Sequence, residues 1–405
     1  MKSPFNIHDN GTITLPEGFS AGATFAGIKT PGKDKKDIGL LFSSTPCTVA
    51  GTYTQNSVRS PSVTLCKELV DSKSDFRGLV VNSGCANCAV GEQGYLDATE
   101  TTKIAAEYVG VNPNEILIAS TGVIGVELPM ALIREYVPKI NLDENGGNDF
   151  AKSILTTDTR TKQIAVSFEV EGKKVVVGGV SKGSGMIHPN MATMLAFLTT
   201  DANVSQHLLQ NILSQSVSKS FNQIDVDGDQ STNDTVLIFS NGNSDVSITP
   251  ESPHFDVFQR AISFVCTYLA KEIAKDGEGA SKLIEVTVEK AKSESDALVA
   301  SKSVAGSLLV KTAVYGRDPN WGRIMMAVGK TGIPLNESKI DIYINEIQIV
   351  SEGKAISYNV NSIVAALGKK EVGIKISLNI GDGFGQAWGS DLTEEYVVFN
   401  SAYTT

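Results

Sequence analysis

The apolar and polar positions of this 405-residue chain alternate between the spacing typical of strands and that typical of helices. Apolar and polar residues alternate over 164–170, Glu171 and Gly172 are expected to turn the chain, and 173–180 returns, which predicts a β-hairpin. Between Val204 and Phe221, and between Phe258 and Ile273, apolar residues recur at the spacing of one helix face. A further helix is expected at 96–108, and further strands are expected at 77–82, 115–120, 283–288, 308–314, 340–349, 373–380 and 396–400.

The order of these elements predicts an α/β fold of a particular kind. Several expected strands follow one another without a helix between them, which disfavours a doubly wound parallel sheet. We expect mixed sheets layered with helices, in an α-β-β-α type of sandwich. Clusters of turn-forming residues at 141–148 and 241–253 mark soft boundaries.

Composition excludes several classes of partner. The 35 basic and 45 acidic residues give a net charge of −10, so we expect no nucleic-acid or anionic-membrane partner. The chain start lacks the pattern of a signal peptide, and the odd number of cysteines, five, indicates reduced thiols and a cytoplasmic protein. Four scattered histidines and one Cys85-x-x-Cys88 pair predict no metal site, and packing is favoured over a redox role for the pair.

One acidic segment resembles a metal loop only superficially. Asp225, Asp227 and Asp229 flank Gly228, but the twelfth position of a calcium-binding loop would be Val236 where glutamate is needed. An acidic turn is the better interpretation.

Residues 180–201 carry the strongest chemical signal. Lys182 stands beside a Gly-Ser-Gly loop, and Pro189 is expected to begin a helix-like run. In that run Ala192 places a small residue before the hydroxyl of Thr193. From the residues alone, Thr193 is either a nucleophile or a packing residue of a core helix, and the spacing favours packing.

The chain resembles the ornithine acetyltransferase family, also called the glutamate N-acetyltransferases, over nearly its whole length. The motifs that carry the resemblance are 82–84 (NSG), 120–125 (STGVIG), 155–159 (LTTDT), 182–195, 222–229, 276–280 (DGEGA), 316–324 (GRDPNWGRI), 387–392 (AWGSDL) and the C-terminal 400–405. One departure is His188, where the family usually has a smaller residue. We expect this histidine to face solvent or pack in its loop.

The resemblance implies a self-processing enzyme. The precursor would cleave itself between Ala192 and Thr193, giving an α chain of residues 1–192 and a β chain of residues 193–405. The new α-amine of Thr193 would then act as general base for its own hydroxyl. The implied reaction moves acetyl from N2-acetyl-L-ornithine to L-glutamate through acetyl-Thr193, a ping-pong step of arginine biosynthesis.

The resemblance also implies the remaining site residues. Thr121 and Gly122 would form the oxyanion hole. The implied substrate-binding residues are Thr156, Lys182, Thr193, Glu278, Asn400 and Thr405. No cofactor and no metal are expected, and acetyl-CoA is left open as a second acetyl donor.

The family further implies an assembly of two α and two β chains. Two alternatives stay open at this point: a hydrolase of the N-terminal-threonine amidase or aminopeptidase type, and a binding protein that keeps the fold without activity.

Overall fold

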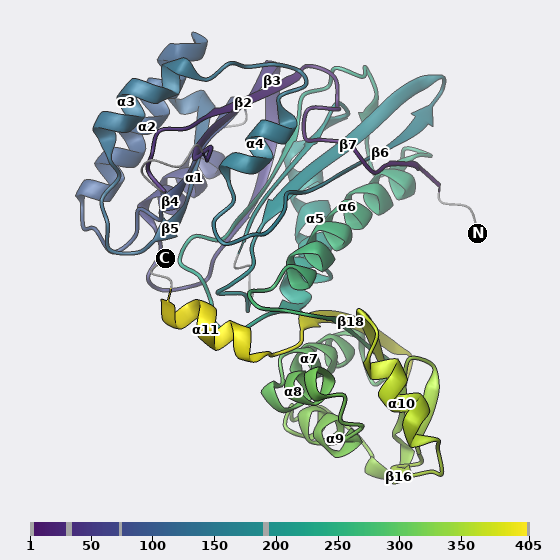
Figure 1. Cartoon of the computed structure of the whole chain (residues 1–405). Helices are drawn as coiled ribbons and strands as arrows, with labels where there is room; N and C mark the ends of the chain where they lie inside the picture. The colour runs from purple at the N-terminus through teal and green to yellow at the C-terminus, as the bar shows by residue number, and fades with distance from the viewer. Residues whose placement is uncertain (1–3, 30–34, 73–74, 189–193, 403–405) are drawn as a thin grey trace.

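The computed structural model describes residues 4–29, 35–72, 75–188 and 194–402. Two bodies are visible in Figure 1, a larger layered one and a smaller one that contains α7 to α10. The larger body is built on a nine-stranded mixed sheet with the order β1-β6-β7-β8-β11-β3-β4-β5, and β2 pairs with β3. Its strands are β1 Asn6–His8, β2 Phe19–Thr24, β3 Ile38–Tyr53, β4 Phe76–Cys85, β5 Ile116–Val123, β6 Lys162–Val170, β7 Lys173–Lys182, β8 Leu195–Thr200 and β11 Thr235–Ser240.

The long strand β3 belongs to two layers. Its first part, residues 38–43, pairs with β2 and β4, whereas its second part, residues 48–53, pairs with β11. Leu79 and Val81 of β4 therefore share one core with Leu195 and Phe197 of β8, between the two layers. Helix α4 Gly147–Ser153 contributes to the same core.

The outer face of each layer is covered by helices. Because side chains alternate along a strand, Val80 of β4 points away from the shared core and packs with α1 Pro61–Ser72, α2 Gln93–Val109 and α3 Met130–Tyr136. In the same way Ala196 and Leu198 of β8 pack against α5 Gln206–Ser218 and α6 Phe255–Lys275. The layers thus run helix, sheet, sheet, helix, which confirms the predicted sandwich.

The smaller body has its own mixed seven-stranded sheet. Its order is β10-β18-β13-β17-β14-β15-β16, with β13 parallel to β17 and antiparallel to β18. Its elements are β10 Ile224–Asp225, β13 Leu283–Ala291, β14 Asp341–Ile344, β15 Ile347–Ser351, β16 Lys354–Ala355, β17 Glu371–Ser377, β18 Gly383–Ser390, α7 Glu294–Ala305, α8 Leu308–Gly316, α9 Trp321–Gly329 and α10 Val360–Leu367. Helix α11 Glu394–Ala402 then returns towards the larger body (Figure 1). A two-stranded sheet pairs β9 Asn203–Val204 with β12 Ser247–Ile248.

Four sequence-based expectations about secondary structure are wrong. The strands expected at 308–314 and 396–400 are helices α8 and α11, because a short apolar run has no period that separates the two structures. The helix-like run expected from Pro189 is, in its described part, strand β8, whose six residues are all buried. The strand expected at 340–349 divides into β14 and β15 at Asn345 and Glu346, both of which have positive φ.

The expected cleavage point lies, along the sequence, between strands β7 and β8, and its two residues are outside the described part of the chain. Strands β7 and β8 on its two sides pair antiparallel, with Lys182 opposite Leu195 and Ser181 opposite Ala196. Two pieces divided here would therefore share one sheet.

In the described ranges, no single helix is long and apolar enough to cross a membrane. Helices α7 and α8 satisfy that length and composition only as a pair, with an angle of 55° between them.

Candidate functional site

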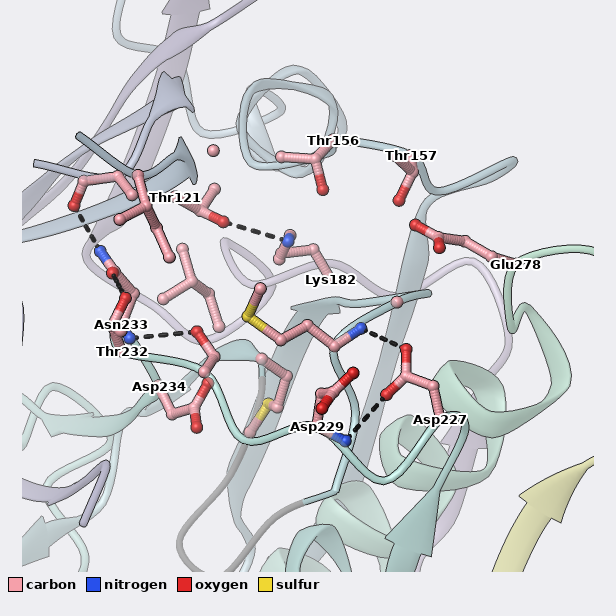
Figure 2. A pocket seen from close by; sticks show the side chains of 18 of the residues that line it. Thr121, Thr156, Thr157, Lys182, Asp227, Asp229, Thr232, Asn233, Asp234 and Glu278 are labelled. Atoms are coloured by element: carbon pink, nitrogen blue, oxygen red, sulfur yellow. Dashed lines mark hydrogen bonds between the residues drawn. The ribbon is translucent and has the colours of Figure 1, made fainter. Parts of the chain in front are cut away.

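An open cavity of about 830 Å³, its mouth included, lies beside the ends of β5, β7 and β8. Its wall includes six of the nine residues predicted for the site: Thr121, Gly122, Thr156, Lys182, Glu278 and Asn400. The other three, Ala192, Thr193 and Thr405, lie outside the described residues. Met194, which directly follows Thr193 in the sequence, lines the cavity. Several of these side chains converge on the cavity in Figure 2.

Thr121 and Gly122 end strand β5 next to the end of β4. Gly122 lies opposite Gly84, and its φ of 133° is a conformation that favours glycine. A Cβ added at Gly122 would stand 2.3 Å from the carbonyl carbon of Gly84. Only glycine therefore allows β4 and β5 to approach this closely at the cavity wall.

Lys182 ends strand β7 and points its ammonium at the same place. The side chain is buried, and Nζ donates a hydrogen bond of 3.1 Å to Oγ1 of Thr121 (Figure 2). Burial lowers the pKa of Lys182, while the carboxylates of Asp158 and Glu278 oppose that shift. The cation of the site is thus held in a dry environment by nearby anions.

Asp158 connects two segments that carry predicted site residues. Its carboxylate accepts hydrogen bonds from the backbone N–H of Gly183 (2.7 Å) and of Thr156 (3.1 Å). It also pairs with Lys162 at 2.5 Å, and both side chains are 0 % exposed. Burial alone would raise the pKa of Asp158, but Lys162 and Lys182 outweigh it and hold the pKa well below its usual range. Asp158 is therefore ionised beside Lys182.

Lys29 binds the backbone of the segment that carries Thr156. Its Nζ donates to the backbone carbonyls of Leu155 (2.9 Å) and Thr156. Burial, together with the charge of Lys182, lowers the pKa of Lys29 to about 8. This lysine is missed by reasoning from the sequence, because its acceptors are backbone atoms far away in the chain.

The opposite side of the cavity is acidic. The Glu278 carboxylate lies against Gly185, where a Cβ would come within 2.3 Å of it, and accepts a 2.9 Å bond from Nδ2 of Asn400 on α11. Asp227 accepts hydrogen bonds from the backbone N–H of Met186 (2.6 Å) and Ile187 (2.8 Å). The Asp227 side chain is labelled in Figure 2. The segment interpreted as an acidic turn therefore also fixes the loop that follows Lys182.

His188 lies outside this wall. Its Nδ1 is 2.6 Å from Oδ2 of Asp225, and its side chain is 42 % exposed. Of the two expected positions, the side chain has the solvent-facing one, and its ring contacts Asp225 of β10. The five cysteines are all buried, and Cys85 donates from Sγ to the carbonyl of Val126 at 3.0 Å, as expected for packing residues.

Several lining residues were missed by reasoning from the sequence. Asp227, Asn233 and Tyr396 line the cavity, and burial together with the nearby carboxylates raises the pKa of the Tyr396 phenol. Asp227 lies within the motif at 222–229, and this membership is the one feature of the sequence that could have marked it as a site residue. Asn233 and Tyr396 act through contacts between distant segments.

Comparison with known proteins agrees with the resemblance. The profile of the ArgJ family matches residues 20–405. The chain is 47 % identical over 406 residues to the arginine biosynthesis bifunctional protein ArgJ of Dehalococcoides mccartyi, and the match covers 100 % of both proteins. The ArgJ structure from Bacillus halodurans is 44 % identical with a TM-score of 0.51, covering 52 % of this chain and 100 % of that chain. The ornithine acetyltransferase of Mycobacterium tuberculosis, solved with ornithine, is 30 % identical with a TM-score of 0.43, covering 46 % and 98 %. The chain therefore belongs to the ArgJ family.

Proposed function

We propose that this protein is a glutamate N-acetyltransferase of arginine biosynthesis, which moves acetyl from N2-acetylornithine to glutamate through an ester on Thr193. The observation that carries the proposal is one cavity that gathers Thr121, Gly122, Lys182 and Glu278 around Met194. Each group has a partner in the reaction: an oxyanion, a carboxylate or an amine. The similarity to arginine biosynthesis proteins over the whole chain supports the same substrate class.

The first half of the reaction loads the enzyme. The Thr193 hydroxyl attacks the acetyl carbonyl of N-acetylornithine and gives its proton to the Thr193 α-amine. The tetrahedral oxyanion collapses, the C–N bond breaks, and ornithine leaves after its nitrogen receives that proton. In the second half the neutral α-amine of glutamate attacks the ester and gives one proton to the Thr193 α-amine. The C–O bond to Thr193 then breaks, the Thr193 oxygen takes that proton back, and N-acetylglutamate leaves.

The hydrogen bond of Lys182 prepares Thr121 for the oxyanion. A hydroxyl has one hydrogen and two acceptor positions. Because the ammonium of Lys182 occupies an acceptor position of Oγ1, the hydrogen of Thr121 is free to point into the cavity. Together with the backbone N–H of Gly122, this hydrogen forms the pair of donors that an acyl-transfer intermediate needs.

Charge places the substrates. Lys182 is suited to a substrate carboxylate, and Glu278 on the opposite wall is suited to a substrate ammonium. Thr156 and Asn400 add polar groups on the two sides of the cavity.

Self-cleavage between Ala192 and Thr193 is part of the proposal. The Thr193 hydroxyl attacks the Ala192 carbonyl, the acyl group shifts from nitrogen to oxygen, and water hydrolyses the ester. Two observations support it. The pairing of β7 with β8 would keep the two pieces together. The matched chain of the Bacillus halodurans structure is covered completely, yet it spans only 52 % of this chain. Residues 193–405 make up nearly the same fraction of the 405 residues.

The test is mass spectrometry combined with an assay. The purified wild type should give two fragments under denaturing conditions, convert N-acetylornithine and glutamate to ornithine and N-acetylglutamate, and carry acetyl on the second fragment. Thr193→Ala should stay in one piece and be inactive. Release of acetate without N-acetylglutamate would favour the hydrolase, and an intact, inactive wild type would contradict the proposal.

The use of acetyl-CoA as a second acetyl donor is tested separately. Replacing N-acetylornithine by acetyl-CoA in the same assay should again yield N-acetylglutamate if acetyl-CoA is a second donor. Light scattering of the processed enzyme checks the proposed assembly of two α and two β chains.

A further inference from the structure

Asn233 has a side-chain amide whose two hydrogens are both used in hydrogen bonds. The residue is 5 % exposed and lies two positions before β11. Its Nδ2 donates to the backbone carbonyls of Ala86 (2.6 Å) and Ser120 (2.8 Å). Its Oδ1 accepts from Oγ1 of Thr232 at 2.6 Å, and both of these residues are labelled in Figure 2. An amide nitrogen has two hydrogens, so both are used and the orientation of the group is fixed.

The two carbonyls belong to the strand ends that form the oxyanion wall. The Ser120 carbonyl is part of the peptide group whose N–H belongs to Thr121, so the bond from Asn233 orients that peptide. Ala86 follows the Gly84 region of β4, against which Gly122 packs so closely that no Cβ fits. Asn233 therefore clamps the ends of β4 and β5 to each other at the point where Thr121 and Gly122 meet the cavity.

The backbone next to Asn233 is joined to the start of β8. The N–H of Thr235 donates to the Met194 carbonyl at 3.1 Å, and Thr235 lies opposite Leu195 in the parallel β8–β11 pair. Met194 directly follows Thr193 in the sequence. The segment 233–235 thus contacts the end of β5 through the Asn233 side chain and the start of β8 through the Thr235 backbone.

We propose that Asn233 is a positioning residue, which holds the Thr121–Gly122 wall in register with the start of β8 so that an oxyanion formed there meets its donors. The inference rests on the proposed function. The oxyanion exists only during the reaction, so loss of this register lowers kcat and leaves KM nearly unchanged. A misplacement of about 1 Å can reduce a rate by about 100-fold.

The chain offers a matched control at the other end of β11. Asn241 is 8 % exposed, and its Nδ2 donates to the Glu17 carbonyl (2.9 Å) and to Oγ of Ser43 (3.3 Å). It makes the same kind of bridge between distant segments but does not line the described cavity. Asn233→Leu and Asn241→Leu each remove the two amide hydrogens and keep the same branched side-chain shape, so the steric change is the same in both variants.

The experiment compares the two variants with wild type in acetyl transfer from N-acetylornithine to glutamate. Rates are divided by the amount of second fragment that N-acetylornithine acetylates, so that incomplete self-cleavage does not enter kcat. We expect kcat of Asn233→Leu to fall about 100-fold with KM within about threefold, and kcat of Asn241→Leu to stay within about twofold despite a similar fall in Tm.

Three results would overturn the inference: unchanged kcat in Asn233→Leu, a loss that appears only in KM, or equal losses of kcat in both variants. A wild type without acetyl transfer would instead contradict the proposed function, so the two failures are distinguishable.

Asn233→Asp provides a second readout if the leucine variant does not fold. Its ionised carboxylate has no hydrogen to donate, whereas the protonated form donates one. The kcat of Asn233→Asp relative to wild type should therefore rise as the pH falls. A ratio that does not change with pH would contradict the positioning role.

Discussion

The two sides of the cavity are built in opposite ways. The cationic side presents Lys182, which is 8 % exposed, and behind it lie Asp158 and Lys162, whose side chains are 0 % exposed. The acidic side consists of Glu278 and Asp227 together with Asn400 of α11. Every residue of α11 is at least partly exposed, and Val397 is 65 % exposed.

This difference matches what the two proposed substrates have in common. N-acetylornithine and glutamate both carry an α-carboxylate, whereas their side chains end in an ammonium and a carboxylate. We infer that the buried cation of Lys182 binds the shared α-carboxylate and that Glu278, which is half-buried, pairs with the ornithine ammonium. A buried ion pair is costly to break, by about 3–5 kcal/mol, whereas exposed pairs contribute about 0–1 kcal/mol. Substitutions on the cationic side should therefore have larger effects.

The largest effect is expected for Lys182→Met. The change removes the cation for the substrate carboxylate and the donor that orients Thr121, so kcat/KM should fall about 1,000-fold for both substrates. Steady-state kinetics measures it. Lys282→Met is the control, since Lys282 is also buried and bonds the carbonyls of Val314 and Tyr315. A loss below about tenfold in Lys182→Met would contradict the cationic side as described.

Asp158→Asn should have the next largest effect and a characteristic pH dependence. Asp158 raises the pKa of Lys182 against the effect of burial, so its removal lets Lys182 lose its proton at lower pH. We expect kcat/KM to fall about 30-fold near neutral pH and the alkaline limb of its pH profile to move to lower pH. An unshifted alkaline limb would show that the Asp158 charge does not support Lys182.

Asp158 also makes stability depend on pH. Its folded pKa lies below the unfolded value of about 3.9, so its stabilisation is present above that pH and is lost as the pH falls. The free energy of unfolding of Asp158→Asn should approach that of the wild type in acid. Urea titrations at several pH values measure this convergence.

Glu278→Gln should separate the two substrates. It removes the anion that faces the ornithine ammonium, so KM for N-acetylornithine should rise about tenfold while KM for glutamate changes by less than about threefold. Glu272→Gln, which removes the partner of Arg160 outside the described cavity, serves as control. Equal changes for both substrates would place the ornithine ammonium elsewhere.

Asn400→Ala should have the smallest effect. Asn400 is exposed and its contact with Glu278 is a single 2.9 Å bond, so we expect about a threefold rise in KM for N-acetylornithine. A loss as large as that of Lys182→Met would mean that α11 is as essential to binding as the buried side.

The sequence predicts the parts of this fold that have a clear period. The β6–β7 hairpin and the face of α6 follow directly from alternating and helical spacing. Helices α8 and α11 were missed because Leu308–Val314 and 396–400 are short and present no readable period. Strand β8 was missed for a related reason, since burial on both faces removes the alternation that identifies a strand.

The site shows a similar division. Residues such as Thr121 and Lys182 belong to motifs that a resemblance transfers, and they do line one cavity. Asp158 and Asn233 act on backbone groups of other segments, so their importance depends on tertiary contacts that neighbouring residues in the sequence do not encode.

The pairing of β7 with β8 has a consequence for how the protein refolds before and after the proposed cut. Before the proposed cut, folding is an event within one molecule, and its equilibrium does not depend on protein concentration. After the cut, unfolding would release two chains, and recovery would require them to find each other, so apparent stability should rise with concentration. The covalent link in the uncut chain thus helps β8 to pair with β7 only during the first folding of the molecule. After the cut this link is gone, so refolding of the denatured, mature enzyme should become less efficient on dilution.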